Sequence, residues 1–244
     1  MCGRYATTRT PADLDRAFEA RLGEGAADLE PDYNLAPTKT APIVVARVQD
    51  DAPPVRELMA ARWGLVPSWA KDPKIGNRMI NARSETVAEK PAFKRAFGRR
   101  RALVPADGYY EWYTSDDPDA PRTKAGKPLK QPFYITPKDG EVMAMAGLYE
   151  FWRAGPDEPW LVTFTVLTTS AEDDLGHLHD RMPLLVEPEA RDAWLDPTPH
   201  DPAELLDLLV PAAPGRLAAW PVSTAVNDVR NNGPELVLPR EAEV

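Results

Sequence analysis

The sequence is poor in the residues that build metal centres and cross-links. Among its 244 residues there is one cysteine, Cys2, and there are three histidines, His177, His179 and His200. One cysteine excludes an intramolecular disulfide and a cysteine-rich zinc site, so nothing in the chain depends on an oxidising compartment. His177 and His179 would point to opposite faces of an extended segment. We therefore expect neither a metal site nor an organic cofactor.

Long apolar stretches are also lacking. No window approaches the roughly 18 consecutive apolar residues of a membrane span, and the chain does not open on a basic and then apolar signal sequence. Apolar residues make up 43% and charged residues 27%, which is typical of a globular protein with a true core. No repeat or low-complexity linker divides the chain. We expect a single domain over residues 1–244, monomeric and cytoplasmic, with no membrane partner.

An excess of positive charge is missing as well, because the net charge is −9. This balance argues against a protein that coats nucleic acid indiscriminately. The exception is the segment 71–101, which carries ten basic and three acidic residues and leaves −16 on the rest of the chain. Such a segment is either a phosphate-binding groove on an acidic body or a solvated helix face.

Capping residues and apolar spacing predict a few short helices. The first follows an N-cap at Thr10 and has Pro11 at its first position, with Leu14, Phe18 and Leu22 on one face. The predicted helices cover Pro11 to about Arg21, Ala92 to Phe97, Pro188 to Leu195 and Pro202 to Leu209, and Ser170 caps a short turn over 171–175.

Alternating or continuous apolar runs predict a larger number of strands. They cover Ala41 to Val48, Val55 to Trp63, Ala102 to Pro105, Gly108 to Tyr113, Gln131 to Thr136, Val142 to Trp152, Trp160 to Thr169, Leu184 to Val186 and Trp220 to Val222. Residues 115–130 are predicted to form an exposed, flexible hairpin loop. The sum is an α+β single domain around an antiparallel, barrel-like β-sheet with short peripheral helices.

Two aromatic segments stand out from this pattern. Trp63 and Trp69 flank a loop of Gly and Pro, which either covers the core as a lid or exposes a stacking platform. In the strand over 108–113, Tyr109, Glu111 and Tyr113 share one face. A glutamate between two tyrosines is out of place in a simple core, so Glu111 is either catalytic or paired with a nearby arginine.

Cys2 gains a distinct chemistry once Met1 is removed, because its thiol and the α-amine then share one carbon atom. The amine, with a pKa of about 7.7 to 8.0, is partly neutral at physiological pH and attacks an aldehyde to form a Schiff base. The thiol then closes on the imine carbon and gives a thiazolidine ring. The alternative is that Cys2 is only a small second residue that permits removal of Met1.

Seven short segments occur in a recognisable order along nearly the whole chain. They are residues 1–5 (MCGRY), 33–37 (YNLAP), 63–67 (WGLVP), 81–86 (NARSET), 105–112 (PADGYYEW), 179–183 (HDRMP), and 222–223 (VS) with 231–236 (NNGPEL). In these segments the chain resembles the SRAP (SOS response-associated peptidase) family of abasic-site processing proteins. The resemblance implies the SRAP fold and a role in the response to DNA damage.

The resemblance further implies covalent capture of abasic sites in single-stranded DNA, without a cofactor. Cys2 matches the residue that forms a thiazolidine with the ring-opened C1′ aldehyde. Glu111 matches an acid that transfers protons for ring opening and imine formation, and its aromatic setting is expected to raise its pKa. His179 matches a histidine that assists formation and reversal of the Schiff base. Asn81 matches an asparagine that hydrogen-bonds the captured sugar.

DNA contacts are implied in the same way, first by Arg83, which matches a phosphate-binding arginine. The other candidates are arginines beside catalytic residues, a base-wedging or stacking pair, and basic residues of segment 71–101, namely Arg4, Arg181, Pro67, Trp69, Lys90, Lys94 and Arg95. For Pro67 and Trp69, packing in the core is the alternative. His177 and His200 lie outside the matched motifs and are assigned to the core or the surface. The expected partner is single-stranded DNA with abasic sites, which brings the protein to the nucleoid.

Two other functions remain open from the sequence. A set of Cys, His and Asn or Glu also suits a thiol-dependent peptidase that acts on its own N-terminus or on other proteins. A non-catalytic protein that binds single strands or junctions would need neither Glu111 nor His179. The position of Cys2 favours aldehyde capture, because a peptidase nucleophile needs no free amine. While Met1 remains, that amine is an amide and no thiazolidine can form.

Overall fold

The structure is a computed structural model that describes residues 2–48, 53–115, 117, 121–171, 178–198 and 200–240. Strands dominate, and they are β1 (Tyr5–Thr7), β2 (Arg21–Leu22), β3 (Asp32–Leu35), β4 (Thr40–Arg47), β5 (Val55–Trp63), β6 (Asn81–Arg83), β7 (Arg101–Ala106), β8 (Gly108–Thr114), β9 (Lys130–Pro137), β10 (Met143–Trp152), β11 (Leu161–Ser170), β12 (Arg181–Pro183) and β13 (Leu217–Pro221). The helices are short, and they are α1 (Pro11–Phe18), α2 (Ser84–Val87), α3 (Lys94–Arg99), α4 (Arg191–Leu195) and α5 (Pro202–Asp207), with 3-10 turns η1 (Pro73–Arg78), η2 (Pro188–Ala190), η3 (Thr224–Asn227) and η4 (Pro234–Val237).

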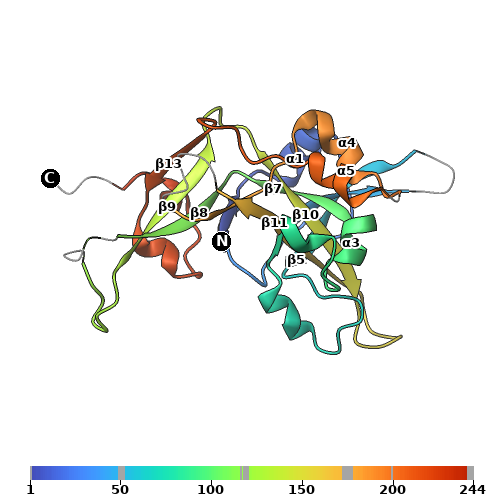
Figure 1. Ribbon diagram of the computed structural model, residues 1–244, viewed down its shortest axis with the longest axis horizontal. Helices are drawn as coiled ribbons and strands as arrows, with labels where there is room; N and C mark the ends of the chain where they lie inside the picture. Colours follow the sequence, from blue (N-terminus) through green and yellow to red (C-terminus); the bar gives the residue numbers. More distant parts are fainter. Residues whose placement is uncertain are drawn as a thin grey trace.

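The larger of two sheets has the order β12-β11-β10-β7-β4-β5-β2, and β6 pairs with β11. A parallel contact between β11 and β5 brings the two sides of this sheet together, with Phe164 opposite Trp63. The strands β5, β4, β7, β10 and β11 therefore form a barrel-like ring, seen edge-on at the right of Figure 1.

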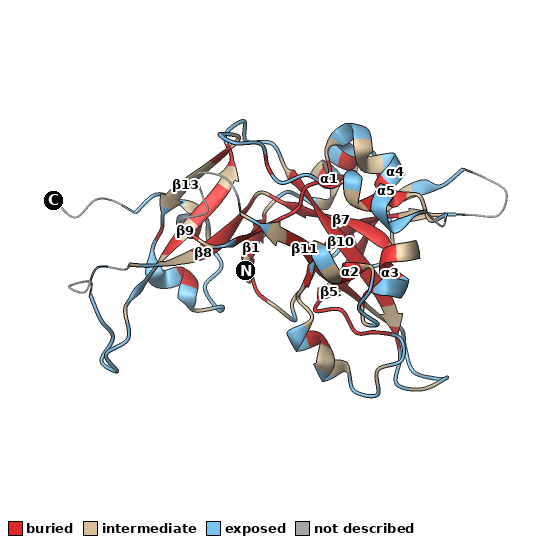
Figure 2. Cartoon of the chain, in the orientation of Figure 1, coloured by how far each residue is buried: buried red, intermediate tan, exposed pale blue. Residues whose placement is uncertain are grey.

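Side chains alternate between the inside and the outside of this ring, as the period of two in a strand requires. On β7, Ala102, Val104 and Ala106 join one apolar cluster with residues from the other strands, whereas Leu103 joins a second cluster. The second cluster also takes Phe18 of α1 and residues of α3, α4 and α5, so these helices cover the outside of the ring. The buried segments of Figure 2 follow the strands, and the exposed faces belong to helices and loops.

The smaller sheet has the order β13-β9-β8-β1-β3 and lies at the left of Figure 1. It leaves the ring where β7 continues into β8 through Asp107. The Asp107 carboxylate fixes this junction by accepting hydrogen bonds from the Thr8 backbone N–H (2.5 Å) and hydroxyl (2.9 Å) and from Arg9 Nε (3.0 Å). The N-terminal segment consequently runs between the two sheets.

The predicted α+β architecture and barrel-like core are confirmed, including the hairpin of β4 and β5. The sheet is not wholly antiparallel, because β5 and β6 both run parallel to β11 and β2 runs parallel to β5. Of the described residues in the predicted 115–130 loop, most are exposed, and Arg122 and Pro128 form an antiparallel bridge. Within the described ranges, no helix is long and apolar enough to cross a membrane.

Three predicted boundaries were wrong near the N-terminal half. The first helix ends at Phe18 and not near Arg21, because Glu19 takes a left-handed conformation (φ 50°) that ends the helix. Arg21 and Leu22 instead pair with β5. The helix predicted over 92–97 begins two residues later, at Lys94, and ends at Arg99.

Two predicted strands near the C-terminus were displaced. The strand predicted over 184–186 is β12, three residues earlier, where Met182 pairs with Thr169. Leu184 and Val186 still donate backbone hydrogen bonds to Leu167 and Ala144, which explains their apolar pattern. The last strand is Leu217–Pro221 and not 220–222. The predicted turn over 171–175 lies mostly outside the described residues.

Candidate functional site

Cys2 lies at the junction of the two sheets, just before β1. Strand β1 runs antiparallel to β8, with Tyr5 opposite Tyr109, and the Arg4 carbonyl accepts a hydrogen bond from the Tyr110 N–H (2.9 Å). Continuing this register toward the N-terminus places Gly3 opposite Glu111, with Cys2 one residue further along. The Cys2 side chain is fully buried in the cluster that fills the ring, and burial raises the pKa of its thiol. The thiol is thus held protonated in this state.

Asn81 holds the Cys2 backbone in place. Its Nδ2 atom donates a hydrogen bond to the Cys2 carbonyl oxygen at 2.7 Å. Asn81 is the first residue of β6, and the backbone N–H of Val166 on β11 bonds the preceding Ile80 carbonyl, which fixes its place along the ring. The Asn81 Oδ1 atom is buried and has no hydrogen-bond partner in the described part of the chain. That oxygen is therefore available to a donor from a ligand.

Glu111 provides the acid of the site. It lies on β8 opposite Phe133 of β9, shares its face with Tyr109 and Tyr113, and is 3% exposed. Burial raises the pKa of its carboxyl to about 7, and the nearby Asp180 carboxylate acts in the same direction. A carboxyl with this pKa exchanges a proton readily at neutral pH.

His179 supplies a second titrating group, and the Asp180 carboxylate acts to raise the pKa of both His179 and Glu111. Its Nδ1 atom accepts a hydrogen bond from the Arg181 backbone N–H at 3.0 Å, which suits the neutral ring. The same atom lies 2.8 Å from Asp180 Oδ1, a contact that suits the protonated ring. Burial lowers the pKa of His179, so the neutral, proton-accepting form is favoured.

The predicted DNA contact Arg181 is held inside the fold. Its guanidinium makes a two-pronged ion pair with Glu85, with Nη1–Oε1 at 2.6 Å and Nη2–Oε2 at 3.0 Å. Nη2 also donates to the Thr168 carbonyl oxygen at 2.6 Å. The residue is only 8% exposed, so in this state it ties β12 and α2 to the end of β11. Neither Glu85 nor Thr168 was among the residues predicted from the sequence, although Glu85 lies within a matched motif.

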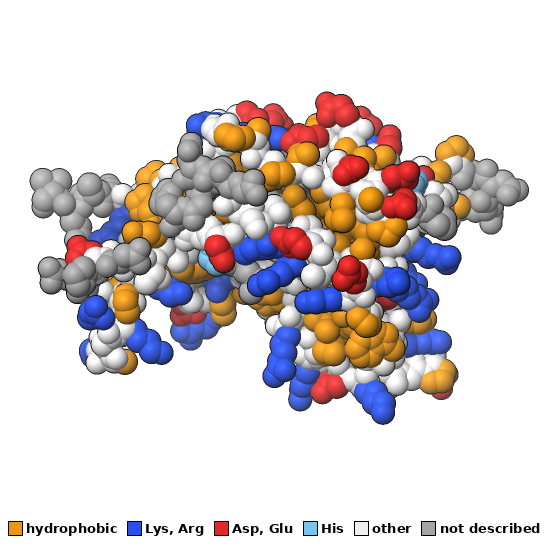
Figure 3. Space-filling model, viewed as in Figure 1, with side chains coloured by type: hydrophobic (Ala, Val, Ile, Leu, Met, Phe, Trp, Pro, Cys, Tyr) orange, Lys and Arg blue, Asp and Glu red, His pale blue; other side chains and the backbone are white. Residues whose placement is uncertain are grey.

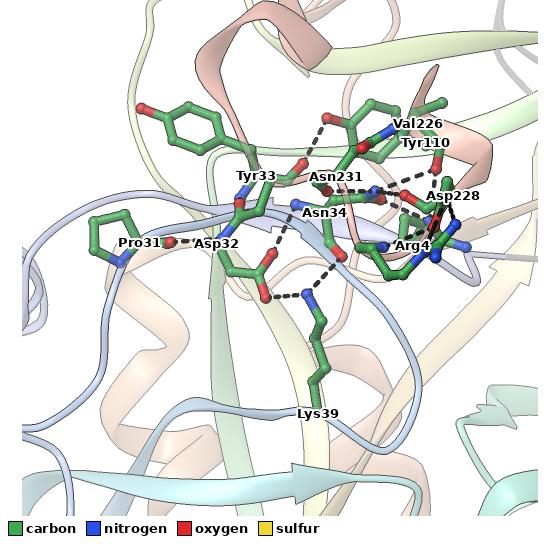
Figure 4. Close-up of polar contacts among 12 residues, drawn as sticks. Arg4, Pro31, Asp32, Tyr33, Asn34, Lys39, Tyr110, Val226, Asp228 and Asn231 are labelled. Atoms are coloured by element: carbon green, nitrogen blue, oxygen red, sulfur yellow. Dashed lines mark hydrogen bonds and ion pairs between the residues drawn. The ribbon is translucent and has the colours of Figure 1, made fainter. Parts of the chain in front are cut away.

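Arg4 is engaged in a similar way by the smaller sheet. Its Nη1 atom donates to Asn34 Oδ1 at 2.6 Å and to the Val226 carbonyl at 2.8 Å, and its guanidinium lies 5.7 Å from the Trp112 ring centre. Figure 4 shows Arg4 and Asn34 meeting the C-terminal segment 226–231. Sequence reasoning identified Arg4 as a phosphate contact and missed Asn34, whose only signal was its place in a matched motif.

The remaining predicted DNA contacts differ in exposure. Arg83 at the end of β6 is exposed, and so are Trp69 and three basic residues around α3, which are Lys90, Lys94 and Arg95. Arg95 Nη1 donates to Ser68 Oγ at 3.3 Å, which connects α3 to the loop that carries Trp69. Pro67 is buried. Figure 3 shows Lys and Arg side chains across the middle of one face and around its lower lobe, where they border a hydrophobic patch.

The other two histidines lie apart from this arrangement. His200 contacts Asp196 Oδ2 (3.1 Å) and Thr198 Oγ1 (3.2 Å) at the surface, and His177 is outside the described residues. Across the described ranges, no group of three or more His, Cys, Asp or Glu side chains is placed to hold a metal ion. The candidate site remains the predicted set Cys2, Asn81, Glu111 and His179, with Asp180 as an addition that the sequence prediction did not name.

Comparisons with known proteins place this arrangement in a family. Two relatives match the chain over most of its length: the abasic site processing protein YoqW of Bacillus subtilis is 38% identical over 239 residues, covering 97% of this chain and 99% of its own. The abasic site processing protein HMCES of Gallus gallus is 34% identical over 279 residues, covering 100% of this chain and 79% of its own.

Solved structures share the fold. A protein from Bacteroides thetaiotaomicron superimposes with a TM-score of 0.78 at 23% identity, covering 98% of this chain and 100% of that one. A phage-related protein from Bordetella bronchiseptica superimposes with a TM-score of 0.65 at 32% identity, covering 91% and 94%. Residues 1–229 match the family described as SOS response associated peptidase (SRAP). The chain therefore belongs to the SRAP family.

Proposed function

We propose that this protein captures abasic sites in single-stranded DNA by forming a covalent thiazolidine between Cys2 and the sugar aldehyde. One observation carries the proposal: Asn81 holds the Cys2 carbonyl at 2.7 Å beside the buried Glu111, whose carboxyl has a pKa of about 7. Aldehyde capture needs an amine, a thiol and a group that both gives and takes protons near neutral pH. The names of the relatives, abasic site processing proteins, support the same substrate.

The reaction begins with removal of Met1, which converts the amide nitrogen of Cys2 into an amine. That amine attacks C1′ of the ring-opened sugar, and loss of one water molecule leaves a C=N bond. The Cys2 sulfur then bonds to the same carbon, and the thiol proton passes to nitrogen as the C=N bond becomes single. Removal of Met1 consumes one water molecule and releases methionine, and capture of the aldehyde then releases one water molecule, so atoms balance in both steps without a cofactor.

Each neighbouring group has a role in these steps. Glu111 in its neutral form protonates the ring oxygen as the sugar opens and protonates the hydroxyl that leaves as water. His179, favoured in its neutral form by burial, accepts a proton from the attacking amine. The unpartnered Oδ1 of Asn81 accepts a hydrogen bond from a sugar hydroxyl, while its Nδ2 keeps Cys2 in place.

Binding of the DNA strand falls to the exposed cations and the exposed tryptophan. Arg83, beside Asn81 in β6, is placed to bind a phosphate next to the lesion, and Lys90, Lys94 and Arg95 extend this positive surface. Trp69, 60% exposed, offers a flat face for a base. Arg4, Arg181 and Pro67 are held in the fold, and their direct contact with DNA stays a prediction. Action as a monomer in the cytoplasm, at the nucleoid, is part of the proposal.

Intact-mass measurement tests the proposal directly. Purified protein is weighed before and after incubation with single-stranded DNA that contains one abasic site. We expect loss of Met1 and then a heat-stable adduct whose mass is that of protein plus DNA less one water. Cys2→Ala should give no stable adduct, and Cys2→Ser should give at most a labile imine. A stable adduct of unchanged yield with Cys2→Ala would overturn the proposal.

The same samples separate the two alternative functions. A peptidase would cleave a peptide substrate in trans, would lose that activity with Cys2→Ala and would be indifferent to DNA. A non-catalytic binder would retain its DNA behaviour in Glu111→Ala and His179→Ala. We expect neither outcome, because both alternatives leave the amine of Cys2 without a function.

A further inference from the structure

A pocket lies on the outside of the ring at α3, away from Cys2 and at the edge of the positive surface described above. It has a volume of about 480 Å³ and is lined by Pro91, Lys94, Arg95, Gly98, Arg99 and His200. Lys94 and Gly98, and likewise Arg95 and Arg99, are four residues apart, so each pair lies on one face of the helix. The pocket combines residues of the basic segment with a histidine more than 100 positions away in the sequence.

The cations of this pocket are not neutralised by the protein. Lys94, Arg95 and Arg99 are exposed, and among the described residues no carboxylate lies within ion-pair distance of any of them. Arg95 and Arg99 also repel the neighbouring Arg100, whose pKa is lowered by burial and further by these two cations. A cluster of like charges in a concave surface is favourable when an anion occupies it.

His200 completes the rim from the other side. Its Nε2 atom contacts Asp196 Oδ2 at 3.1 Å and Thr198 Oγ1 at 3.2 Å, which fixes the orientation of the ring. The Asp196 carboxylate is engaged by His200 and also by the Thr198 N–H. Three cationic side chains and an oriented imidazole therefore remain facing a ligand.

Gly98 supplies an independent indication that the pocket is kept open. Glycine inside a helix costs roughly 0.8–1.0 kcal/mol relative to alanine. Two usual reasons for a glycine do not apply at this position: among the described residues a Cβ atom on Gly98 would meet no heavy atom within 4 Å beyond its chain neighbours and the backbone of its own helix, and its φ is not in the left-handed region. A side chain here would project into the pocket and fill space that the protein itself does not use.

We propose that this pocket binds the terminal phosphate of a DNA strand. Two guanidinium groups match the geometry of phosphate oxygens, and a phosphate monoester at a strand end carries more charge than a diester within the strand. A concave pocket also suits the end of a DNA strand, because the end can enter it, whereas an internal stretch of the strand needs a groove that is open at both ends. The Arg95–Ser68 hydrogen bond joins the pocket to the surface that carries Trp69, so a strand on that surface has its end within reach.

The choice of DNA as the anion's source rests on the proposed function, whereas the anion site itself does not. The test therefore uses undamaged DNA, which cannot be captured covalently. A short oligonucleotide with an internal fluorophore is prepared with a 5′-phosphate, a 3′-phosphate or only hydroxyl ends. Binding is followed by fluorescence anisotropy at one fixed salt concentration, since phosphate contacts depend on salt. Inorganic phosphate serves as competitor.

We expect one phosphorylated end to bind about tenfold more tightly than the hydroxyl form, as a charged pair of hydrogen bonds predicts. Gly98→Leu fills the pocket and retains every cation, and Arg99→Ala removes one cation, so both should abolish the difference. Arg78→Ala removes an equally exposed arginine of the same segment outside the pocket and should keep it. Added inorganic phosphate should lower the affinity of the end-phosphorylated oligonucleotide to that of the oligonucleotide with hydroxyl ends.

Equal affinities for all three oligonucleotides would overturn the inference, even if inorganic phosphate binds on its own. So would a preference that survives both Gly98→Leu and Arg99→Ala. The abasic-site mass assay on the same preparations keeps the two proposals apart. An intact adduct without end discrimination refutes the pocket alone, and end discrimination without an adduct refutes the crosslink alone.

Discussion

The side-chain amide of Asn81 reaches the backbone of Cys2, with 2.7 Å between Nδ2 and the carbonyl oxygen. The two residues come from different parts of the fold, since Asn81 begins a strand on the ring and Cys2 precedes a strand of the smaller sheet. This hydrogen bond, together with the pairing of β1 with β8, sets where Cys2 lies relative to the ring. Orientation of a reacting group is one of the larger contributions to catalysis.

Replacing Asn81 by Asp should slow adduct formation about tenfold or more. Aspartate keeps an oxygen for the sugar hydroxyl but cannot donate to the Cys2 carbonyl, and two oxygen atoms would then face each other. The measurement is the single-turnover rate of adduct formation with abasic single-stranded DNA in excess.

Asn81→Ala is the matched variant for that experiment, because it removes both the donor and the acceptor. If Asn81 acts only through the sugar, Asp should retain most of the rate and Ala should lose it. Our expectation is that Asp is as slow as Ala. A thermal melt of each variant checks that the fold is retained.

Replacing Glu111 by Gln should stabilise the protein above pH 7 and yet impair capture. The folded pKa of about 7 lies above the ordinary value of 4.5, so the folded protein holds a proton that the unfolded chain releases. Stability from this group is therefore complete below about pH 4.5 and is lost as pH rises through 7. Gln mimics the neutral acid, so at pH 8 the free energy of unfolding of Glu111→Gln should exceed that of the wild type by on the order of 3 kcal/mol at most.

Urea unfolding at pH 5 and pH 8 checks the sign. Wild type and Glu111→Gln should be close at pH 5 and should diverge at pH 8, with Gln the more stable. Adduct formation should fall by about 10²-fold or more, because Gln cannot transfer a proton. If the wild type and Glu111→Gln differed in stability by the same amount at pH 5 and pH 8, the raised pKa of Glu111 would be contradicted.

Much of this fold follows from local pattern. The β5 boundaries were predicted correctly because the strand ends at Trp63, and the following Gly64 takes φ 121°, which breaks the strand. The two faces of β8 were also predicted correctly, since Tyr109 and Tyr113 belong to one cluster and Tyr110 and Trp112 to another. A period of two is a property of the strand itself and survives any tertiary context.

What the pattern cannot give is the partner of a polar side chain across the fold. Arg181 was predicted to meet phosphate, yet it lies in a pocket made by Glu85 and Thr168, which are 96 and 13 residues away in the sequence. The parallel edges of β5 and β6 on β11 were missed for the same reason, because they depend on the closing of the ring. Burial of Cys2 is likewise a result of how the two sheets meet.

Substitution by alanine should have different effects on DNA binding and on stability at Arg83 and at Arg181. Arg83→Ala removes an exposed cation, so it should reduce the slope of log binding constant against log salt by about one and leave stability within about 0.5 kcal/mol. Arg181→Ala removes the buried partner of an ion pair with Glu85 and the hydrogen bond to the Thr168 carbonyl, at a cost of roughly 2 kcal/mol. Salt titrations of DNA binding and urea unfolding, performed on both variants, distinguish the two. A stable Arg181→Ala with a reduced salt slope would instead make Arg181 a direct phosphate contact.

Asn34 should prove to hold the C-terminal segment 226–231 against the rest of the fold. It is fully buried, and its Nδ2 atom lies within hydrogen-bond distance of the carbonyl oxygens of Val226 (3.2 Å), Asp228 (3.0 Å) and Asn231 (2.9 Å). Its Oδ1 accepts from Arg4 Nη1, two residues after Cys2. Asn34→Leu keeps the volume but removes one donor from three carbonyls, of which that of Val226 keeps Arg4 Nη1 as a partner, and removes one acceptor from the Arg4 guanidinium. We expect a cost of about 2–4 kcal/mol.

The loss should appear first where those carbonyls lie. We expect limited proteolysis of Asn34→Leu to begin within residues 222–238 under conditions where the wild type is intact. We also expect adduct formation to slow, because Arg4 loses its hydrogen bond to the Asn34 side chain. Asn231→Ala is the control, since it removes one exposed side-chain bond to the Ala225 carbonyl but leaves the Asn231 carbonyl for Asn34. That variant should remain within about 1 kcal/mol of the wild type. If Asn34→Leu is equally mild, the C-terminal segment is held by its apolar contacts through Val222, Val226 and Leu236 and not by this network.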